Sequence, residues 1–457
     1  MKLSQIACIL NAIFKGKDED FEFVSIDTRT MQPGSLFIAL QGPHFDAHNF
    51  IEAAAERGAV GAVVSRWIET SLPQIFVNNT HAALIQLGSY QRDQMKEAMV
   101  LAAVTGSCGK TTTRTLLTSI FRQQGKVLAS ERSFNNNIGL PLSLLRLRAE
   151  HDYVVVELGA NHPGEIAQLT QIARPNIAII TNAGLVHLEG FGSIEGVAKA
   201  KGEIYQGLPP DGTAIVNNDD HFSNFWREII GIRRTVTFAS NSPTDVTAKN
   251  ISVNPEGQPR FCLILPNEEA DLQLSLLGKH NIMNALAAAA AAYAQNIPIM
   301  VIKVGLEAVS TINGRLASRK GYRGATIIDD SYNANPLSVS AAIDVLAACG
   351  RRSILVLGDM RELGDGGDQL HRKIGEQALQ SGIHELFCYG SLTRHTTEAF
   401  GINAYHFDDQ EKLLIVLKNN LDENTVVLVK GSLSMNMGKI VKGLIEESVC
   451  YSGSVMF

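Results

Sequence analysis

The chain has 457 residues, which is the length of about three domains. Its 45% hydrophobic and 19% charged residues are ordinary for globular proteins and exclude a disordered, collagen-like or coiled-coil chain. The formal net charge of −6 provides no basic surface for nucleic acid, so we expect no nucleic-acid partner.

Residues 1–83 form the first predicted unit, a small α/β domain with short strands, one helix and turns near 32–34 and 41–43. The apolar stretch at its start lacks the cleavage site of a signal peptide, and no apolar run in the sequence is long enough to span a bilayer. The cysteines are scattered, which predicts free thiols in a reducing compartment and indicates the cytoplasm. They are Cys8, Cys108, Cys262, Cys349, Cys388 and Cys450.

A glycine-rich loop follows an apolar strand predicted at 99–104 and precedes a helix. Only two residues separate Gly106 from Gly109, so the loop is shorter than the common P-loop. Its backbone N–H groups and Lys110 can bind phosphate, and the hydroxyl of Thr111 suits Mg2+. The alternative is a glycine turn with an unrelated lysine, but the strand and helix around the loop favour nucleotide binding.

Residues 84–313 predict a second domain, in which strands alternate with helices. Apolar strands at 153–158 and 177–181 indicate a mostly parallel sheet covered by helices on both faces. Residues 246–277 predict a β-rich appendage, and the alanine-rich run at 284–293 predicts a buried helix.

Two polar residues of this domain follow its strands, at the edge where such sheets bind ligands. Glu157 ends an apolar strand, so its carboxylate can hold a metal ion. The alternative is a carboxylate that only caps a helix. His187 follows the next strand through a glycine-containing loop. Alone it would indicate a structural histidine, and it gains weight only together with the other residues.

The helix predicted at 194–205 carries a lysine that faces inward. Projection at 100° per residue places Lys201 on the apolar stripe and Lys199 on the opposite face, spaced to pair with Glu195 and Glu203. Burying an ammonium is costly unless its pKa falls. A neutral amine can take up CO2 and become an anionic carbamate that binds metal. The alternative is a lysine whose head reaches water.

Residues 314–457 predict a third domain, doubly wound and Rossmann-like. Its strands are predicted at 325–328, 353–357 and 425–429, and each is followed by polar or glycine residues. Because ligands bind at this carboxyl edge, we expect the second and third domains to share a cleft. The predicted fold class is α/β, with three domains and a P-loop-type ATPase domain in the centre.

Motifs along nearly the whole chain resemble those of the ATP-dependent Mur ligases of peptidoglycan synthesis, which share a fold with folylpolyglutamate synthase. The matching segments are TGSCGKTT from Thr105, NNNIGLPL from Asn135, VVVELGANHPGEI from Val154, TNAGLVHLEGFG from Thr181, AKAKGEI from Ala198, GKHNIMNALAAAA from Gly278, INGR ending at Arg315, DDSYNANP from Asp329 and LGDMRELG from Leu357. Two residues depart from the family pattern: Ala47, in a turn that usually has glycine, and Cys108, in a place more often Asn or Ser.

Within the family, the DDSYNANP and GDMRELG segments favour the member that joins D-alanyl-D-alanine to UDP-N-acetylmuramoyl-tripeptide (UDP-MurNAc-tripeptide). The resemblance implies that this ATP-dependent ligase works through an acyl phosphate and releases ADP and phosphate. We also expect a monomer. The alternatives are the neighbouring Mur ligase that adds a single amino acid, whose usual DNPR-like element is absent here, and an ATP-dependent small-molecule kinase.

The resemblance also implies roles for individual residues. The catalytic residues would be Lys110, Glu157, His187 and Lys201. ATP would be bound by Thr105, Gly106, Ser107, Cys108, Gly109, Lys110, Thr111, Thr112, Asn281, Arg315 and Asp330. The UDP-substrate would be bound by Ser25, Asp27, Thr28, Arg29, Asp46, His48, Asn135 and Asn136. Thr111 and Glu157 would hold one Mg2+, and His187 with a carbamylated Lys201 a second. The third domain would close on ATP and bind the dipeptide.

Overall fold

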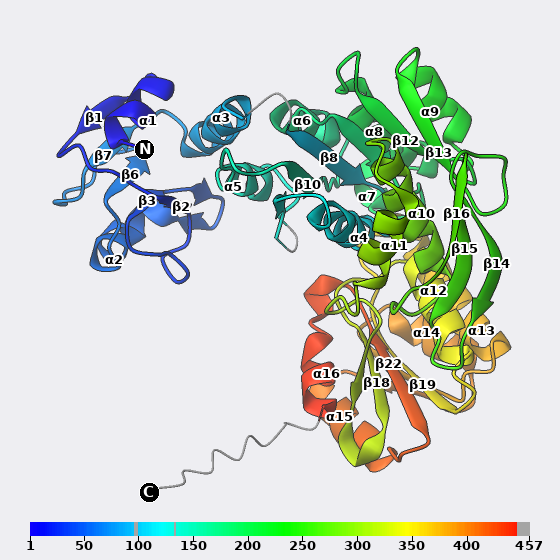
Figure 1. The fold of residues 1–457 in the computed structure, drawn as a ribbon. Coiled ribbons are helices and arrows are strands. Elements are labelled where there is room, and N and C mark those ends of the chain that lie inside the picture. The colour runs from blue at the N-terminus through cyan, green and yellow to red at the C-terminus, as the bar shows by residue number, and fades with distance from the viewer. Residues whose placement is uncertain (96–98, 132–133, 446–457) are drawn as a thin grey trace, which may run out of the picture.

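The structure is a computed structural model that describes residues 1–95, 99–131 and 134–445. Cys450 lies outside the described residues, and the other five cysteines are free thiols, as predicted. Three bodies, each built on its own sheet, follow one another along the chain, with the second between the first and the third (Figure 1).

The first body is a five-stranded sheet in the order β1-β7-β6-β3-β2, parallel except for β1. Its strands are β1 (Ile13–Lys15), β2 (Phe23–Ser25), β3 (Ser35–Ile38), β6 (Gly61–Val64) and β7 (Gln74–Phe76), with a hairpin of β4 (Gln41–Gly42) and β5 (Phe45–Asp46). Its helices are α1 (Leu3–Ile9), η1 (Ala47–Phe50) and α2 (Ile51–Glu56).

The prediction of one helix in this region was therefore wrong, because α1 and α2 are both α-helices. Helix α1 has only seven residues, so its buried face consists of Leu3, Ile6 and Ala7, too short a pattern to stand out in the sequence. The next helix, α3 (Thr80–Asp93), contributes Leu84 and Leu87 to the core of this first sheet.

The second body has a six-stranded parallel sheet in the order β13-β12-β11-β8-β10-β9. The strands are β8 (Val100–Thr105), β9 (Val127–Ala129), β10 (Tyr153–Glu157), β11 (Ile177–Ile180), β12 (Thr213–Asn217) and β13 (Arg234–Phe238). The helices are α4 (Lys110–Arg122), α5 (Gly139–Leu144), α6 (Glu165–Ala173), α7 (Leu188–Phe191), α8 (Ile194–Gln206), α9 (Ser223–Ile230), α10 (His280–Tyr293) and α11 (Ile299–Glu307).

Helices cover both faces of this sheet, as predicted. One apolar core joins the sheet to α4, α10 and α11, and the other joins it to α5, α6, α8 and α9. The predicted β-rich appendage is an antiparallel sheet of β14 (Thr247–Val253), β15 (Pro259–Leu265) and β16 (Glu268–Gln273). It packs on α10, so this alanine-rich helix is buried between two sheets.

The third body has a six-stranded sheet in the order β17-β18-β22-β19-β20-β21, parallel except for β17. Its strands are β17 (Ala317–Lys320), β18 (Thr326–Asp330), β19 (Arg352–Gly358), β20 (Glu385–Tyr389), β21 (Ala404–Phe407) and β22 (Thr425–Lys430). Its helices are η2 (Tyr322–Gly324), α12 (Pro336–Ala347), η3 (Gly364–Gly366), α13 (Gly367–Gln380), α14 (Thr393–Phe400), α15 (Gln410–Asn419), η4 (Leu433–Met435) and α16 (Gly438–Leu444). The two core clusters of this sheet lie on its opposite faces, which confirms the doubly wound α/β class.

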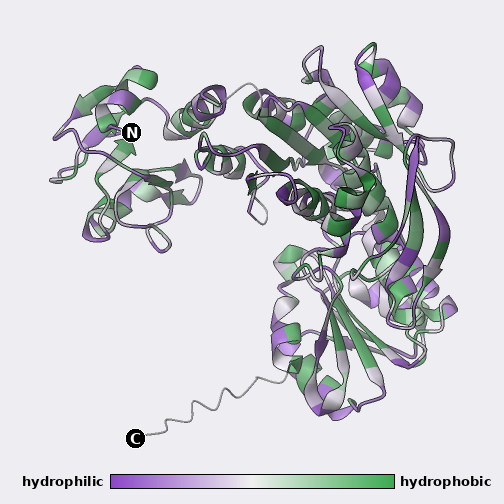
Figure 2. Ribbon diagram, in the orientation of Figure 1, coloured by the Kyte–Doolittle hydropathy of each residue, from purple (hydrophilic) through white to green (hydrophobic). Residues whose placement is uncertain are grey.

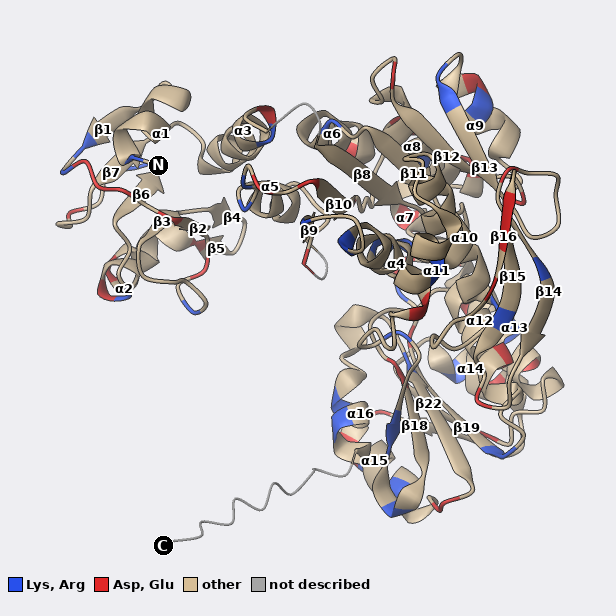
Figure 3. Cartoon of the chain, in the orientation of Figure 1, with Lys and Arg blue, Asp and Glu red and all other residues tan. Residues whose placement is uncertain are grey.

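The central strands β8 and β19 of the second and third sheets are largely hydrophobic and buried along nearly their whole length (Figure 2). Acidic and basic residues are interspersed over the molecule in the view of Figure 3. Among the described residues, no helix is both long and apolar enough to cross a membrane.

Candidate active site

The glycine-rich loop connects β8 to α4, and its two glycines are required by close contacts. Gly106 has a φ of 146° and Gly109 a φ of 82°. A Cβ would lie 1.9 Å from Thr181 Oγ1 at the first position and 2.1 Å from Asn284 Oδ1 at the second. Only glycine therefore allows this loop to lie so close to its neighbours. Helix α4 begins at Lys110, so its free N–H groups lie at the loop, where an anion is favoured.

A cavity of about 280 Å³, here called the loop cavity, lies between this loop and the third domain. The predicted ATP-binding residues that line it are Ser107, Cys108, Gly109, Lys110, Thr112, Asn281, Arg315 and Asp330. Thr105 is fully buried instead, and its hydroxyl donates to Leu158 O at 2.8 Å, so it supports the loop from below.

A second cavity, of about 360 Å³, lies around Glu157 and is here called the Glu157 cavity. Its lining includes the predicted residues Asn135, Asn136, Glu157 and His187. Lys110, Arg315 and Asn333 line both cavities. The two cavities therefore meet at two cations, which is the arrangement that transfer of an anionic group between two bound molecules requires.

Glu157 is 4% exposed and is held by two hydrogen bonds. Thr111 Oγ1 donates to Glu157 Oε2 at 2.8 Å, and Asn135 Nδ2 donates to Glu157 Oε1 at 2.9 Å. The side chain therefore joins the loop to the Glu157 cavity and does not cap a helix. Two ligands at right angles around Mg2+ lie about 2.9 Å apart, so the Thr111 and Glu157 oxygens fit the first metal site.

Lys110 folds back over the loop in this structure. Its Nζ donates to Gly106 O at 2.7 Å and lies 3.4 Å from Ser107 O. Burial lowers the pKa of Lys110, and the carboxylate of Glu157 acts in the opposite direction. The ammonium thus has carbonyl partners that an anionic ligand would replace.

Lys201 faces the interior, as predicted, and is 1% exposed, so the alternative of a head that reaches water is wrong. Burial, followed by the charge of Lys110, lowers the pKa of Lys201 to about 7. Its Nζ lies 5.4 Å from the centre of the Phe191 ring and makes no hydrogen bond or ion pair with any described residue.

The predicted pairing of Lys199 with Glu203 is not formed. Glu203 instead caps α6 by accepting from Gly164 N at 2.8 Å and from Ala167 N at 3.0 Å.

His187 lies at the start of α7 with a φ of 50°. Its ring packs edge-on against Phe191, the residue that Lys201 also faces. Nδ1 contacts the Glu362 carboxylate, which comes from the third domain. Burial outweighs that carboxylate and lowers the pKa of His187. His187 and Lys201 thus share a neighbour, and the third domain reaches the same place.

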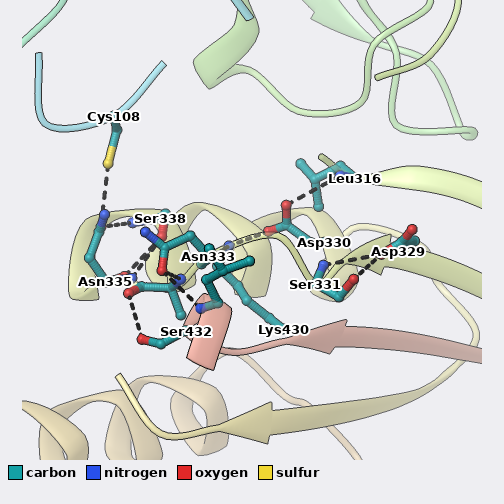
Figure 4. Close-up of polar contacts among 12 residues, drawn as sticks. Cys108, Leu316, Asp329, Asp330, Ser331, Asn333, Asn335, Ser338, Lys430 and Ser432 are labelled. Carbon is teal, nitrogen blue, oxygen red and sulfur yellow. Dashed lines mark hydrogen bonds and ion pairs between the residues drawn. The ribbon is translucent and has the colours of Figure 1, made fainter. Parts of the chain in front are cut away.

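The third domain contributes an ion pair to the loop cavity (Figure 4). Lys430 Nζ donates to Asp330 Oδ2 at 2.5 Å and to Asn333 O at 2.9 Å, and Asp330 Oδ1 accepts from Leu316 N. Lys430 is 1% exposed and Asp330 6%. Asp330 is therefore fixed at the end of β18 by a lysine at the end of the neighbouring strand.

A direct contact also joins the loop to the third domain. Cys108 Sγ lies 3.3 Å from Asn335 Oδ1 at the start of α12 (Figure 4). Arg315 Nη2 lies 3.5 Å from Thr111 Oγ1, and its guanidinium stacks over Tyr332 at 4.4 Å. The second and third domains are thus closed on each other around the loop cavity.

The predicted substrate residues of the first domain form two local networks. Ser25 Oγ accepts from Asp27 N at 3.2 Å, and Arg29 forms a two-pronged ion pair with Asp27. At the other network, burial would raise the pKa of Asp46, but hydrogen bonds from Arg66 and His48 lower it to about 2.

His48 lies behind Asp46. It is 2% exposed, its Nδ1 lies 2.6 Å from Asp46 Oδ1, and its Nε2 accepts from Ser65 N at 2.9 Å. With both nitrogens engaged, His48 orients Asp46 and has no ring nitrogen left for a ligand. Ala47 begins the helix η1, which does not need the glycine usual in the family. Thr28, between Asp27 and Arg29 of the first network, is half-buried.

Three residues of this site were missed by the sequence analysis as functional residues. Asn284 packs against Gly109 and donates to Asn281 Oδ1 at 2.9 Å, while Asn281 Nδ2 donates to Leu277 O. Lys430 and Glu362 come from the third domain. The position of Lys430 at the end of a strand, on the predicted ligand edge, could have indicated its place in the site. Nothing in the sequence indicated that Glu362 contacts His187.

Three family models match successive parts of the chain: "Mur ligase family, catalytic domain" at 20–91, "Mur ligase middle domain" at 104–292, and "Mur ligase, glutamate ligase domain" at 314–433. UDP-N-acetylmuramoyl-tripeptide--D-alanyl-D-alanine ligase of Escherichia coli (strain K12) is 42% identical over 98% of this chain and 99% of its own length. A crystal structure of MurF from Acinetobacter baumannii has a TM-score of 0.89 at 33% identity, covering 96% of this chain and 97% of that one.

A structure of MurF ligase from Thermotoga maritima in complex with ADP has a TM-score of 0.81 at 25% identity, covering 92% of this chain and 96% of that one. The family models, the relative and the structures agree over all three domains. The chain therefore belongs to the Mur ligase family.

Proposed function

We propose that this chain is an ATP-dependent ligase that joins D-alanyl-D-alanine to UDP-MurNAc-tripeptide, giving the pentapeptide precursor of peptidoglycan, ADP and phosphate. The observation that carries the proposal is the meeting of the loop cavity and the Glu157 cavity at Lys110 and Arg315. The 42% identity over 98% of the chain to the E. coli ligase supports the choice of substrates.

The proposed chemistry follows from the weakness of a carboxylate as an acyl donor. The tripeptide carboxylate attacks the γ-phosphorus of ATP, the bond from that phosphorus to the bridging oxygen breaks, and ADP leaves. The dipeptide amine then attacks the carbonyl carbon of the acyl phosphate, phosphate leaves, and the amine loses a proton to solvent. Lys110 and Arg315 would hold the transferring phosphoryl group from both sides and offset its charge.

The donor set around the loop fits Mg2+. Thr111 and Glu157 would hold one ion, and His187 with Lys201 a second. Bound Mg2+ would reduce the repulsion between the nucleophilic carboxylate and the γ-phosphate. The remaining work belongs to the chain: Asn135 orients Glu157, and closure of the third domain excludes water from an intermediate that water would hydrolyse.

Lys201 would act as a carbamate. Its neutral amine would form an N–C bond with CO2 and lose one proton, which turns a group that repels metal into an anionic ligand. Its burial, its lowered pKa and its lack of an anionic partner among the described residues support this proposal.

The remaining residue roles are proposals of the same kind. Asn281 would lie at adenine and Asp330 at the ribose, since both line the loop cavity. Asn136 lines the Glu157 cavity, where it would meet the tripeptide, while Asp27 and Asp46 would lie near the uridine part. The proposed domains are 1–83 for the UDP-substrate, 84–313 for ATP, and 314–457 for closure and the dipeptide. A monomer in the cytoplasm is proposed, and the five free thiols agree with a reducing compartment.

The test is phosphate release by the purified protein with ATP, Mg2+ and UDP-MurNAc-tripeptide, with and without D-alanyl-D-alanine, followed by mass spectrometry of the product. We expect release that depends on both substrates, and a pentapeptide product. Release without the dipeptide would indicate a kinase or ATPase. Activity only with a single amino acid and a dipeptide precursor would indicate the neighbouring Mur ligase.

A further inference from the structure

The terminal carboxylate of the dipeptide has no binding partner in the reaction proposed above. Its amine reacts at the Glu157 cavity, but its free carboxylate needs a cation of its own. The basic side chains among the described residues that line the Glu157 cavity are Lys110, His187 and Arg315. All three have proposed roles at phosphate or metal, so we expect a cation for this carboxylate next to this cavity. This inference rests on the proposed function.

The order of strands in the third sheet indicates where that partner lies. Along the carboxyl edge of the sheet, β18, β22, β19 and β20 are neighbours in that order. Asp330 and Lys430, at the ends of the first two, line the loop cavity. The loop after β19 reaches the reaction centre, where Glu362 contacts His187. The next position along this edge, over β19 and β20, is therefore adjacent to the reacting end of the dipeptide.

The distances agree with this position. Neighbouring strands are about 4.8 Å apart. Two extended residues span about 7 Å. A dipeptide whose amine lies beside the loop after β19 therefore places its carboxylate within one or two strands, over the ends of β19 and β20.

A cavity of about 450 Å³, here called the Arg361 cavity, lies at that position. It is lined by Arg361, Tyr389, Gly390, Ser391, Arg394, Asp408, Ser434 and Met435. The short helix η4 borders both this cavity and the Glu157 cavity, because Leu433 lines the latter and Ser434 and Met435 line the former.

The Arg361 side chain is held in place from below. Its Nη2 lies 3.1 Å from Asp359 Oδ2, and Asp359 is fully buried. Asp359 Oδ1 also accepts from Leu392 N at 3.0 Å and from Thr393 N at 2.9 Å, so its charge is shared with the start of α14. A Cβ on Gly390 would lie 2.4 Å from Asp359 Oδ1, so a glycine is needed there.

The backbone at Arg361 and at the residue before it is fixed as well. Arg361 N donates to Ser432 Oγ at 2.9 Å, and Met360 N donates to the buried His371 Nε2 at 3.0 Å. The contacts of the guanidinium with described residues all use Nη2, and the side chain is 47% exposed. Its Nε and Nη1 therefore remain for a carboxylate. Arg394, the other arginine of the cavity, donates to Asp408 at 2.7 Å on the outer side.

We propose that Arg361 binds the terminal carboxylate of D-alanyl-D-alanine and so sets the position of the dipeptide amine at the acyl carbon. The Ser391 and Ser434 hydroxyls, which line the same cavity, are further donors for this carboxylate.

The test compares D-alanyl-D-alanine with its C-terminal amide as acceptor. We expect the wild-type protein to have a KM about 10- to 100-fold higher for the amide, which lacks the charge that pairs with Arg361. Arg361→Met should raise the KM for the acid by a similar factor, leave the KM for the amide unchanged, and so remove the preference. The KM values for ATP and for UDP-MurNAc-tripeptide should not change.

Two further variants control the comparison. Arg372→Met removes an exposed arginine of the same domain that also pairs with a carboxylate, Glu398, and should retain the full preference for the acid. Arg361→Lys keeps the positive charge but not the planar guanidinium group, so this variant should retain part of the preference for the acid.

The inference is overturned if Arg361→Met retains the wild-type preference for the acid, or if it raises the KM for ATP or for the tripeptide instead. A purely structural role would lower stability without changing the ratio of the two KM values. If the wild-type protein makes no pentapeptide with either acceptor, it is the proposed function that fails, which is a different outcome.

Discussion

Lys201 is a basic residue that lies on the buried face of its helix. Its place on the apolar stripe of α8 removes it from water, and the loss of hydration lowers the pKa of Lys201 to about 7. The amine is therefore largely neutral above pH 7, whereas Lys199, two residues earlier, is exposed to solvent. Helix periodicity alone separates a lysine suited to reaction with CO2 from one that is not.

The prediction at this scale is that Lys201→Ala lowers ligase activity by on the order of 100-fold or more, because one metal would lose its anionic ligand. A short carboxylate such as acetate should restore part of the activity by occupying the vacated space. Lys199→Ala should be unaffected with and without acetate. Steady-state rates of phosphate release measure both, and an acetate effect equal in the two variants would count against the carbamate.

The pH dependence of the wild-type protein follows from the same group. Only the neutral amine adds CO2, and the pKa of Lys201 is lowered to about 7. At limiting CO2, activity should therefore fall as pH falls through about 7, and added bicarbonate should oppose the fall.

At the scale of single elements, the turn from β8 into α4 depends on how close the backbone comes to α10. Gly109 is the residue before α4 and has a φ of 82°, and its missing Cβ leaves room for Asn284. Gly164 stands in the same place before α6, with a φ of 87°, but has no heavy atom within 4 Å of its ideal Cβ position. The two turns therefore differ in packing and not in backbone conformation.

We expect both glycine-to-alanine variants to lose about 1 to 2 kcal/mol of stability from the left-handed backbone. Gly109→Ala should lose a further 1 to 3 kcal/mol, roughly, because its methyl group overlaps Asn284. It should also weaken ADP binding, whereas Gly164→Ala should not. Chemical denaturation and calorimetric titration with ADP measure the two effects. Equal losses in the two variants would mean that the contact with Asn284 has no energetic role.

Much of this site could be predicted from the sequence because its parts are local. The loop glycines, Lys110, Thr111 and the inward direction of Lys201 follow from spacing within one strand, turn or helix. Asn284 could not be found this way, since it meets Gly109 across 175 residues of chain. The contact of Glu362 with His187 depends on how two domains dock, which no local pattern records.

In the fold, too, features that depend on a local sequence pattern were predicted, and contacts between separate elements were not. Continuous apolar runs predicted β8, β10 and β11 of the second sheet and β18, β19 and β22 of the third, whereas the other strands of these two sheets were not predicted. The appendage at 246–277 was correctly predicted as β-rich. Only one helix was predicted where α1 and α2 lie, because the seven residues of α1 and the six of α2 contain too few turns for a period to be visible. The role of Glu203 as a cap for α6 was also missed, because its partners lie on another helix.

At the scale of the whole molecule, the second and third domains are joined around the loop cavity. Cys108 meets Asn335, Arg315 reaches Thr111, and both pairs cross the boundary between the two domains. The first sheet has its own core and takes no part in the loop cavity.

Hydrogen exchange with and without ADP tests this division. At an ADP concentration of about 100 times its Kd, exchange should slow by about tenfold or more in 105–112 and 280–284, and also in 330–338 of the third domain. Exchange in 35–38 and 61–64, within the first sheet, should not change. Protection confined to the second domain would show that the closed arrangement of the two domains does not depend on nucleotide.

The alanine-rich helix α10 has a consequence for which substitutions the protein can accept. Its residues Ala285 to Ala292 are fully buried between two sheets, and the same helix carries Asn281 and Asn284 at the loop cavity. A larger side chain on its face would push the helix, and with it the two asparagines, away from the glycine-rich loop. Buried positions of α10 that do not line the loop cavity should thus tolerate substitution as poorly as the residues that do. A mutational scan would therefore find loss of activity at these positions as well as at the cavity-lining residues.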